Sequence, residues 1–305
     1  MQQGIIYQKT GERRRGQVEN YHGKPSPLKL NRTDHEIDVA GLKATQKREA
    51  IKFDGVRYES RFTIGMEVEK NQLSRGAVKE YELFCGFERD GSCGYEAVTH
   101  ILPLLPSGKW RTKVFDMMYK AEKIIDDKYS PSDKRCGGHI TIGVEGHSGE
   151  EVMQRVRKNC GIVLALFRNR LNNRYCGSNR RMQMEGATGV NSTSHAPESY
   201  IRTYIHQKYQ LALAKGDCLE FRLPSRFDSV KQMMRRYELF YEIVNFSFNN
   251  ESAAHEVLLK RLHPIVLSMY NGDEEKTNKI MELSRHFRKF ILDGKIDESI
   301  AEFLG

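Results

Sequence analysis

The chain has 305 residues, of which 39% are hydrophobic, and its 49 lysines and arginines outnumber its 40 aspartates and glutamates, giving a formal charge of +9 at pH 7. This length and apolar content are sufficient to bury a large core, which excludes a wholly disordered chain. The positive charge favours anionic partners such as nucleotides, acidic peptides or nucleic acid, without choosing among them.

The cysteines and the apolar runs of the sequence indicate the cellular compartment in which we expect the protein. The chain has six cysteines and no Cys-x-x-Cys pair, and a chain of this size does not need disulfides to fold, so we expect reduced thiols. The first residues lack the apolar segment of a secretory signal, and no apolar run approaches the roughly 18 residues of a membrane-spanning helix. The sequence therefore predicts a cytoplasmic protein without a membrane partner.

Residues 1–50 form the first predicted region. Gly, Pro, Asn and basic residues occur there without clear periodicity, which predicts a basic N-terminal extension with little core of its own. Beyond it, short alternating runs bounded by Gly and Asp predict strands over 56–69, 80–88 and 93–105.

Two helices and a long loop are expected next. Over 109–129 apolar side chains recur on one helical face, namely Val114, Met117, Met118, Ala121, Ile124 and Ile125. A strand over 137–146 separates this helix from a second one over 148–175, which opens with an N-capping serine and acids in its first turn. The Gly-, Ser- and Asn-rich segment 176–199 is too long for a plain connector and predicts a binding loop.

The rest of the sequence returns to a strand and then to helices. Residues 218–226 alternate as a strand, residues 228–248 form a long amphipathic helix, and residues 251–305 are expected to be a helical C-terminal segment. Because the helices and strands do not alternate as regular βαβ units, we predict an α+β fold with a largely antiparallel sheet.

Glu67 and Glu69 are the first candidates for a functional site. Side chains alternate along a strand, so glutamates separated by one residue point to the same side. Two carboxylates on a buried face repel each other unless a cation lies between them, and Mg²⁺ prefers oxygen ligands of this kind. A solvated strand would carry the same spacing, so the pair alone leaves both interpretations open.

Glu96 and His139 are further candidates. Glu96 begins an apolar strand after an acid-rich turn, either as a third carboxylate at the sheet edge or as a solvated hairpin residue. His139 follows two glycines, which allow another backbone or a nucleotide to come close. Its imidazole suits a metal ion or a phosphate, and equally an ordinary hydrogen bond.

Glu220 and Arg222 share one side of the predicted strand at 218–226. They form either a buried ion pair or a site where the glutamate binds metal and the arginine binds phosphate. Arginines also gather before and within the long loop, where they bind phosphate or a substrate carboxylate, or stay at the surface: Arg168, Arg170, Arg174, Arg180 and Arg181.

Five short segments, taken in order, carry a family resemblance: IGMEVE, RDGSCGYEAVTH, CGGHITIGV, FRNRLNNRYCGSN and CLEFRLPSR. They resemble the carboxylate–amine ligase superfamily, which includes glutamine synthetase and glutamate–cysteine ligase, and within it the predicted phage-type amidoligases. The resemblance implies a glutamine synthetase-like catalytic domain over 51–250. Such a domain has a curved, largely antiparallel sheet with helices on its convex face, and it binds ATP and Mg²⁺ or Mn²⁺. A phage-encoded member would work in the host cytoplasm.

The resemblance also implies roles for individual residues. The implied metal ligands are Glu67, Glu69, Glu96, His139 and Glu220, with His139 nearest the nucleotide phosphates. The implied contacts to the transferring phosphoryl group are Arg222, Arg168 and Arg180. Many amidoligases carry a Tyr-Arg motif shortly before the Glu-Phe-Arg strand, where this chain offers Lys208 and Arg202, so a nucleotide contact from these two residues is left open.

The implied reaction is ATP- and Mg²⁺-dependent formation of an amide between a carboxylate and an amine through an acyl phosphate. The amine belongs to an amino acid, a peptide or a protein. Guanidino kinases resemble the same fold and transfer phosphoryl without forming an amide, so a phosphotransferase is one alternative. A basic protein that binds nucleic acid without catalysis is the other, because the +9 charge and the arginine-rich segments suit phosphate contacts.

Overall fold

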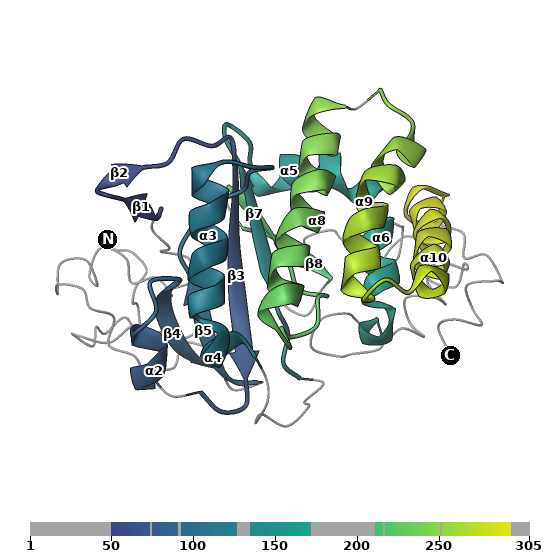
Figure 1. Ribbon diagram of the computed structural model, residues 1–305. Coiled ribbons are helices and arrows are strands. Elements are labelled where there is room, and N and C mark those ends of the chain that lie inside the picture. The colour runs from purple at the N-terminus through teal and green to yellow at the C-terminus, as the bar shows by residue number, and fades with distance from the viewer. Residues whose placement is uncertain are drawn as a thin grey trace, which may run out of the picture.

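The computed structural model describes residues 50–73, 75–90, 93–126, 135–171, 211–215, 217–250 and 252–293 (Figure 1). Almost all of the predicted N-terminal extension, and the whole of the predicted binding loop at 176–199, lie outside these ranges. So do five residues with candidate roles, Arg174, Arg180, Arg181, Arg202 and Lys208.

One antiparallel sheet forms the centre of the described chain. Its strands follow the order β4-β5-β3-β7-β9-β8, with β6 paired to β3. The bounds are β3 Phe62–Lys70, β4 Phe84–Asp90, β5 Gly94–Thr99, β6 Leu102–Pro103, β7 Ile140–Val144, β8 Ala212–Lys215 and β9 Cys218–Phe221. A separate hairpin joins β1 Lys52–Phe53 to β2 Val56–Arg57. The antiparallel sheet of a mixed fold is thus confirmed.

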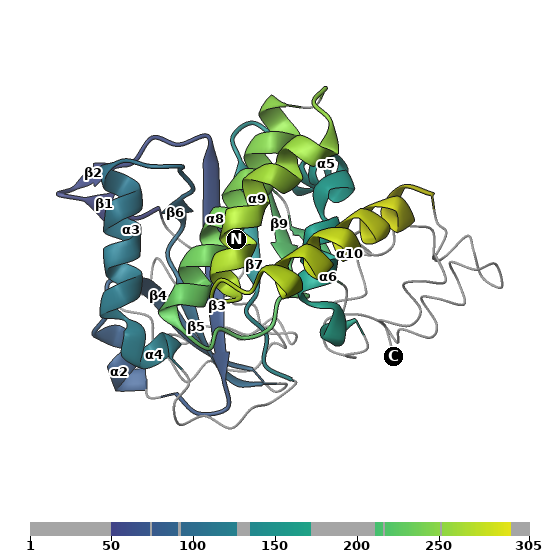
Figure 2. The ribbon, with the colours of Figure 1, turned by 45° about the vertical axis from the view of Figure 1, so that its right-hand side comes forward.

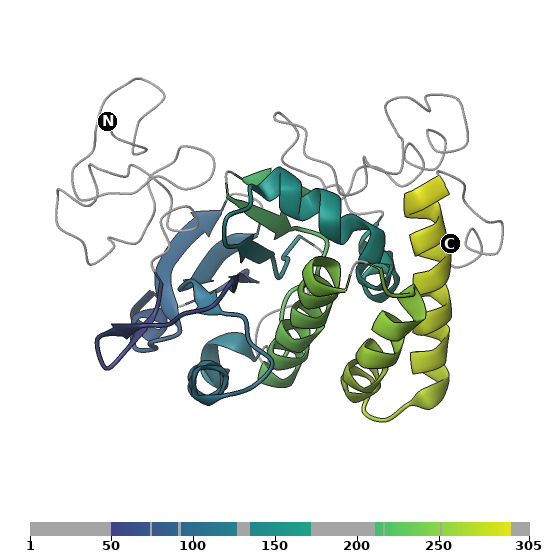
Figure 3. The ribbon, with the colours of Figure 1, turned by 90° about the horizontal axis from the view of Figure 1, so that it is seen from above.

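Three helices cover one face of this sheet, as Figures 1 and 3 show: α3 Lys109–Lys120, α4 Glu122–Ile125 and α8 Val230–Asn249. Phe221 of β9 meets Phe240 of α8 edge to face, with ring centroids 4.8 Å apart. At the end of β3, the buried Lys70 donates from Nζ to the carbonyl oxygens of Ile125 and Phe227, both at 2.9 Å. The apolar side of β3 therefore faces the helices, while the curvature of the sheet stays a prediction.

The other helices pack around this core, on the β4 edge, on β7 to β9, or on other helices. They are α2 Arg75–Lys79, α5 Gly149–Val156, α6 Gly161–Leu166, α9 His255–Met269 and α10 Glu274–Asp293, together with the short 3₁₀ turns Arg157–Asn159 and Arg168–Arg170. Figure 2 shows α6 beside α10. None of the described helices is both long and apolar enough to cross a membrane. The division into 1–50, 51–250 and 251–305 stays a prediction.

The predicted helix over 148–175 is wrong as a continuous element. Its start is confirmed, because Ser148 accepts from the backbone of Glu151 and the Glu151 carboxylate accepts from the backbone of Ser148. The helix then ends at Val156, and α6 begins at Gly161. A Cβ at Gly161 would lie 2.3 Å from the carbonyl oxygen of Ser284 in α10. The break thus lets α6 pack closely on a partner distant in sequence.

Two smaller differences concern the other predicted elements. The helix expected over 109–129 is divided at Ala121 into α3 and α4, although all the side chains of its predicted apolar face are buried. Strand β8 was not predicted, because its sequence Ala-Leu-Ala-Lys is short and contains no β-branched or aromatic residue. It borders β9, which carries a candidate site residue.

Candidate metal centre

The strand register brings the candidate acids to the sheet face opposite α3 and α8. Glu69 is paired with Glu96 of β5, and the backbone N–H of Glu67 donates to the carbonyl oxygen of His139 at 3.0 Å. Thr141 of β7, two residues beyond His139, is paired with Glu220 of β9. Directly paired residues of an antiparallel sheet point to the same side. Residues on or next to four neighbouring strands, β5, β3, β7 and β9, therefore share this face.

These side chains are buried. The exposed fractions are 3% for Glu67, 2% for Glu69, 5% for Glu96, 5% for His139, 1% for Glu220 and 8% for Arg222. The alternative of a solvated strand or hairpin is therefore wrong for these glutamates. Burial of several carboxylates is costly unless cationic groups or hydrogen-bond donors lie among them.

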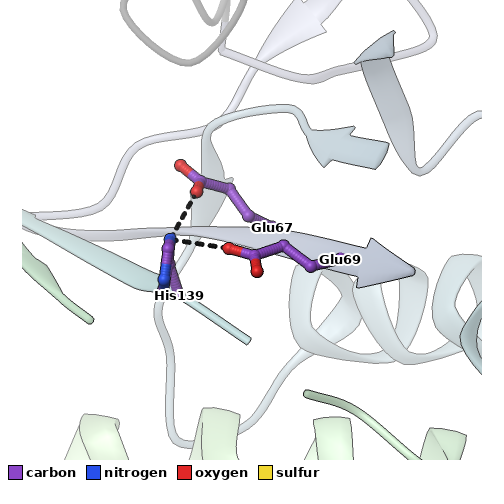
Figure 4. Close-up of side chains that lie close together, drawn as sticks. All are labelled: Glu67, Glu69 and His139. Carbon is purple, nitrogen blue, oxygen red and sulfur yellow. Dashed lines mark hydrogen bonds and ion pairs between the residues drawn. The ribbon is translucent and has the colours of Figure 1, made fainter. Parts of the chain in front are cut away.

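Glu67, Glu69 and His139 converge most closely (Figure 4). The imidazole Nδ1 lies 2.9 Å from Oε2 of Glu67 and 3.1 Å from Oε1 of Glu69. The second oxygen of Glu69 accepts a hydrogen bond from the backbone N–H of Gly137. All three ligand atoms lie within 4.8 Å of one another, an arrangement of two carboxylates and an imidazole that suits a divalent cation.

The two positions before His139 require glycine for different structural reasons. A Cβ at Gly137 would lie 2.7 Å from Nε2 of His139, so this glycine leaves room for the imidazole. A Cβ at Gly138 would lie 2.5 Å from the carbonyl oxygen of Ser225, and the Gly138 N–H donates to the carbonyl oxygen of Pro224 at 3.0 Å. The expectation that small residues let another backbone come close is confirmed at Gly138.

Glu220 and Arg222 form a buried ion pair through Oε1 and Nη1. The pair extends the polar face from β7 onto β9, beside the Glu67–His139 group. This arrangement fits both predicted alternatives, because an arginine held by a carboxylate is also oriented for a phosphate.

The two described arginines of the predicted cluster both contact backbone carbonyl groups. Arg168 is half-buried, and its Nη1 donates to the carbonyl oxygen of Ala165 at 3.1 Å. Within the ranges described above, no hydrogen bond or ion pair joins Arg168 to the buried carboxylates. Arg170 is buried and donates to the carbonyl oxygens of Leu223 and Cys136, both at 2.9 Å. Arg170 therefore ties together the chain segments that flank β7 and β9.

Arg236 of α8 supports the same region and was missed by the sequence analysis. Its guanidinium lies between the rings of Phe167 and Phe227, 4.9 and 4.7 Å from their centroids, and donates to the carbonyl oxygen of Ser225. Burial lowers the pKa of Arg236 to about 9, which leaves the group charged at neutral pH. Its helical spacing in an amphipathic segment gave no signal that it is buried.

Cys93 was also missed as a candidate ligand. It is buried, and its sulfur and the carboxylates of Glu69 and Glu96 form a second group whose ligand atoms all lie within 4.8 Å of one another. Simple alternation from Glu96 would place position 93 on the other side of the strand. Gly94, with a φ of +106°, interrupts the extended backbone between them. That glycine is the signal that could have suggested the change of side.

No family model matches the chain, and no curated protein matches its sequence. Among solved structures, the chain is similar to one in the crystal structure of the complex between prokaryotic ubiquitin-like protein Pup and its ligase PafA. The sequence identity is 10% and the TM-score 0.31, and the match covers 77% of this chain and 64% of that chain. The chain thus spans less than two thirds of the length of the chain in that structure. A TM-score this low assigns neither fold nor activity, so the function is argued from the site itself.

Proposed function

We propose that the chain is an ATP- and divalent-metal-dependent ligase that joins a carboxylate to an amine through an acyl phosphate. The observation that supports this proposal most is the convergence of Glu67, Glu69 and His139, flanked by Glu96 and the Glu220–Arg222 pair, on one buried sheet face. The order of the five motifs in the sequence, which resembles that of carboxylate–amine ligases, supports the choice of reaction.

In this proposal the carboxylates and the imidazole hold the cations. Glu67, Glu69 and His139 supply the closest set, and Glu96 and Glu220 extend it to either side along the sheet. Carboxylate oxygens match Mg²⁺, and the added imidazole is equally suited to Mn²⁺. When bound, such a cation would offset the negative charge on the phosphate oxygens during phosphoryl transfer.

Arg222 is proposed to contact the transferring phosphoryl group. Its ion pair with Glu220 fixes the guanidinium on the same face as the metal ligands. Arg168 contacts the Ala165 carbonyl oxygen through Nη1, and a guanidinium has further N–H donors for the phosphate role expected from the sequence. The roles of Arg180, Arg202 and Lys208 toward phosphate belong to the same proposal.

The proposal is tested first by calorimetric titration of ATP with Mn²⁺ or Mg²⁺, because nucleotide binding requires no knowledge of the substrates. The wild type is compared with Glu67→Gln and Glu220→Gln, which keep the side-chain size and remove the charge. We expect metal-dependent ATP binding in the wild type and at least about tenfold weaker binding in each variant. Glu282→Gln is the matched control, because that carboxylate is exposed on α10 with 71% of its side-chain surface accessible.

Equal ATP affinity in the wild type, both site variants and the control would overturn the assignment of the nucleotide to this face. If binding follows the prediction, hydroxylamine trapping with a panel of carboxylic acids separates the two reactions. A hydroxamate reports an acyl phosphate and supports the ligase. Phosphorylation of a guanidino compound without hydroxamate would replace the ligase with a phosphotransferase at the same site.

A further inference from the structure

The thiol of Cys93 lies beside two of the buried carboxylates, those of Glu69 and Glu96. Cys93 and Glu69 are each 2% exposed and Glu96 is 5% exposed, so all three side chains are removed from solvent. Their ligand atoms lie within 4.8 Å of one another. Glu69 belongs to this group and also to the group with Glu67 and His139. The two groups therefore adjoin through one shared carboxylate.

The distances are compatible with a single ion. Zinc binds sulfur at about 2.3 Å and carboxylate oxygen at about 2.0–2.2 Å, so a sulfur and an oxygen on one tetrahedral ion lie about 3.5–3.7 Å apart. The three ligand atoms lie within 4.8 Å of one another, so side-chain adjustments of up to about 1 Å would bring them onto one tetrahedral ion. Strand pairing of Glu69 with Glu96 fixes two of the three ligands relative to each other.

The group of Cys93, Glu69 and Glu96 should prefer different metal ions from the neighbouring group of Glu67, Glu69 and His139. A thiolate is a soft ligand that favours Zn²⁺ or Co²⁺ over Mg²⁺, whereas the Glu67–Glu69–His139 group is compatible with the harder ions that accompany ATP. Cysteine binds metal as the thiolate, so binding would release the thiol proton to solvent. Three protein ligands would also leave a coordination position for a water or a substrate atom.

We propose that Cys93, Glu69 and Glu96 form a second metal position that selects a thiophilic divalent ion such as Zn²⁺, with Glu69 bridging it to the first position. This inference rests on the metal-binding part of the proposed function and adds a distinct metal preference to it. A cysteine that only fills space just before the start of β5 would have no effect on metal selectivity.

Cobalt is the probe, because a Co²⁺–thiolate bond gives a near-ultraviolet charge-transfer band that carboxylates and imidazole do not give. The metal-free full chain is titrated with Co²⁺ while absorption is recorded, and then challenged with excess Mg²⁺. We expect a thiolate band in the wild type that survives Mg²⁺ and disappears on addition of Zn²⁺. In Cys93→Ser the band should be lost, and Zn²⁺ affinity should fall at least about tenfold.

Two further variants sharpen this test. Cys85→Ser is the matched control, since Cys85 lies on neighbouring β4 and its sulfur donates to the carbonyl oxygen of Thr99 at 3.3 Å. It should keep the wild-type band. Cys93→Asp replaces the thiol with oxygen ligands, so it should bind Co²⁺ without the band and release it to Mg²⁺.

The outcomes separate this inference from the proposed function. Co²⁺ binding with visible ligand-field bands but without a thiolate band, or a band that persists in Cys93→Ser, would overturn the second position and leave the first one standing. No Co²⁺ binding by a folded wild type would overturn both.

Discussion

Gly137 and Gly138 are adjacent, but different neighbours constrain them. An added Cβ at Gly137 meets the end of a side chain, the Nε2 atom of His139, at 2.7 Å. An added Cβ at Gly138 meets backbone, the Ser225 carbonyl oxygen, at 2.5 Å. A side chain can rotate away from a new methyl group, whereas a paired backbone segment cannot without disturbing its partners.

The Gly137→Ala variant should therefore affect mainly metal binding, whereas Gly138→Ala should affect mainly stability. In Gly137→Ala we expect displacement of His139 and about tenfold weaker Mn²⁺ binding by calorimetry, with little change in thermal stability. In Gly138→Ala we expect a loss of about 1–3 kcal/mol in the free energy of unfolding, measured with denaturant. The account of the glycine pair is wrong if both variants lose stability equally and Gly137→Ala binds Mn²⁺ like the wild type.

Residue spacing was enough to predict which of the candidate residues share a face of the sheet. Strand alternation alone places Glu67 with Glu69, and Glu220 with Arg222, and the structure brings both pairs to one face. Alternation failed at Cys93, because Gly94 takes a positive φ and turns the chain. The contacts of Arg168 and Arg170 depend on carbonyl groups of folded segments, which side-chain patterns do not reveal.

At the scale of single elements, helix α9 begins with His255, whose surroundings disfavour the protonated imidazole. His255 is half-buried, and burial, followed by the charge of Arg288 on α10, lowers its pKa to about 4. The positive end of the helix dipole at its first turn opposes a cation there as well.

The folded protein therefore binds fewer protons at His255 than the unfolded chain between pH 6.5 and about 4. Stability contributed by the neutral imidazole is present above pH 6.5 and lost as the pH falls through this window. His255→Gln should remove on the order of 1 kcal/mol of that pH dependence, because solvent screens a half-buried group. Urea unfolding of both proteins at pH 7.5 and pH 5 measures it, and identical losses of stability on acidification would refute the assignment.

Among the elements, the amphipathic helix at 228–248 was predictable because apolar side chains line one side of it, and the central strands were predictable because apolar and polar side chains alternate along them. The interruption between α5 and α6 was not predictable in this way. Its cause is close packing of Gly161 against Ser284, more than a hundred positions later in the chain. Local patterns carry no information on such a contact.

In the molecule as a whole, the two faces of the sheet carry different kinds of side chain. One face is apolar and packs under α3 and α8, apart from the Lys70 amine that holds two backbone carbonyl groups (Figure 3). The opposite face carries the buried acids, His139 and Arg222. The helices make the sheet rigid from behind, so ligands on several strands keep their relative positions.

The central claim is that this acidic face holds the metal and the nucleotide. Crystals grown with Mn²⁺ and a non-hydrolysable ATP analogue test it most directly, through anomalous diffraction near the manganese absorption edge. The account predicts a manganese peak within coordination distance of Glu67, Glu69 and His139, with the terminal phosphate between that ion and Arg222. A fully occupied nucleotide and its manganese bound elsewhere, with these side chains contacting only one another, would contradict it.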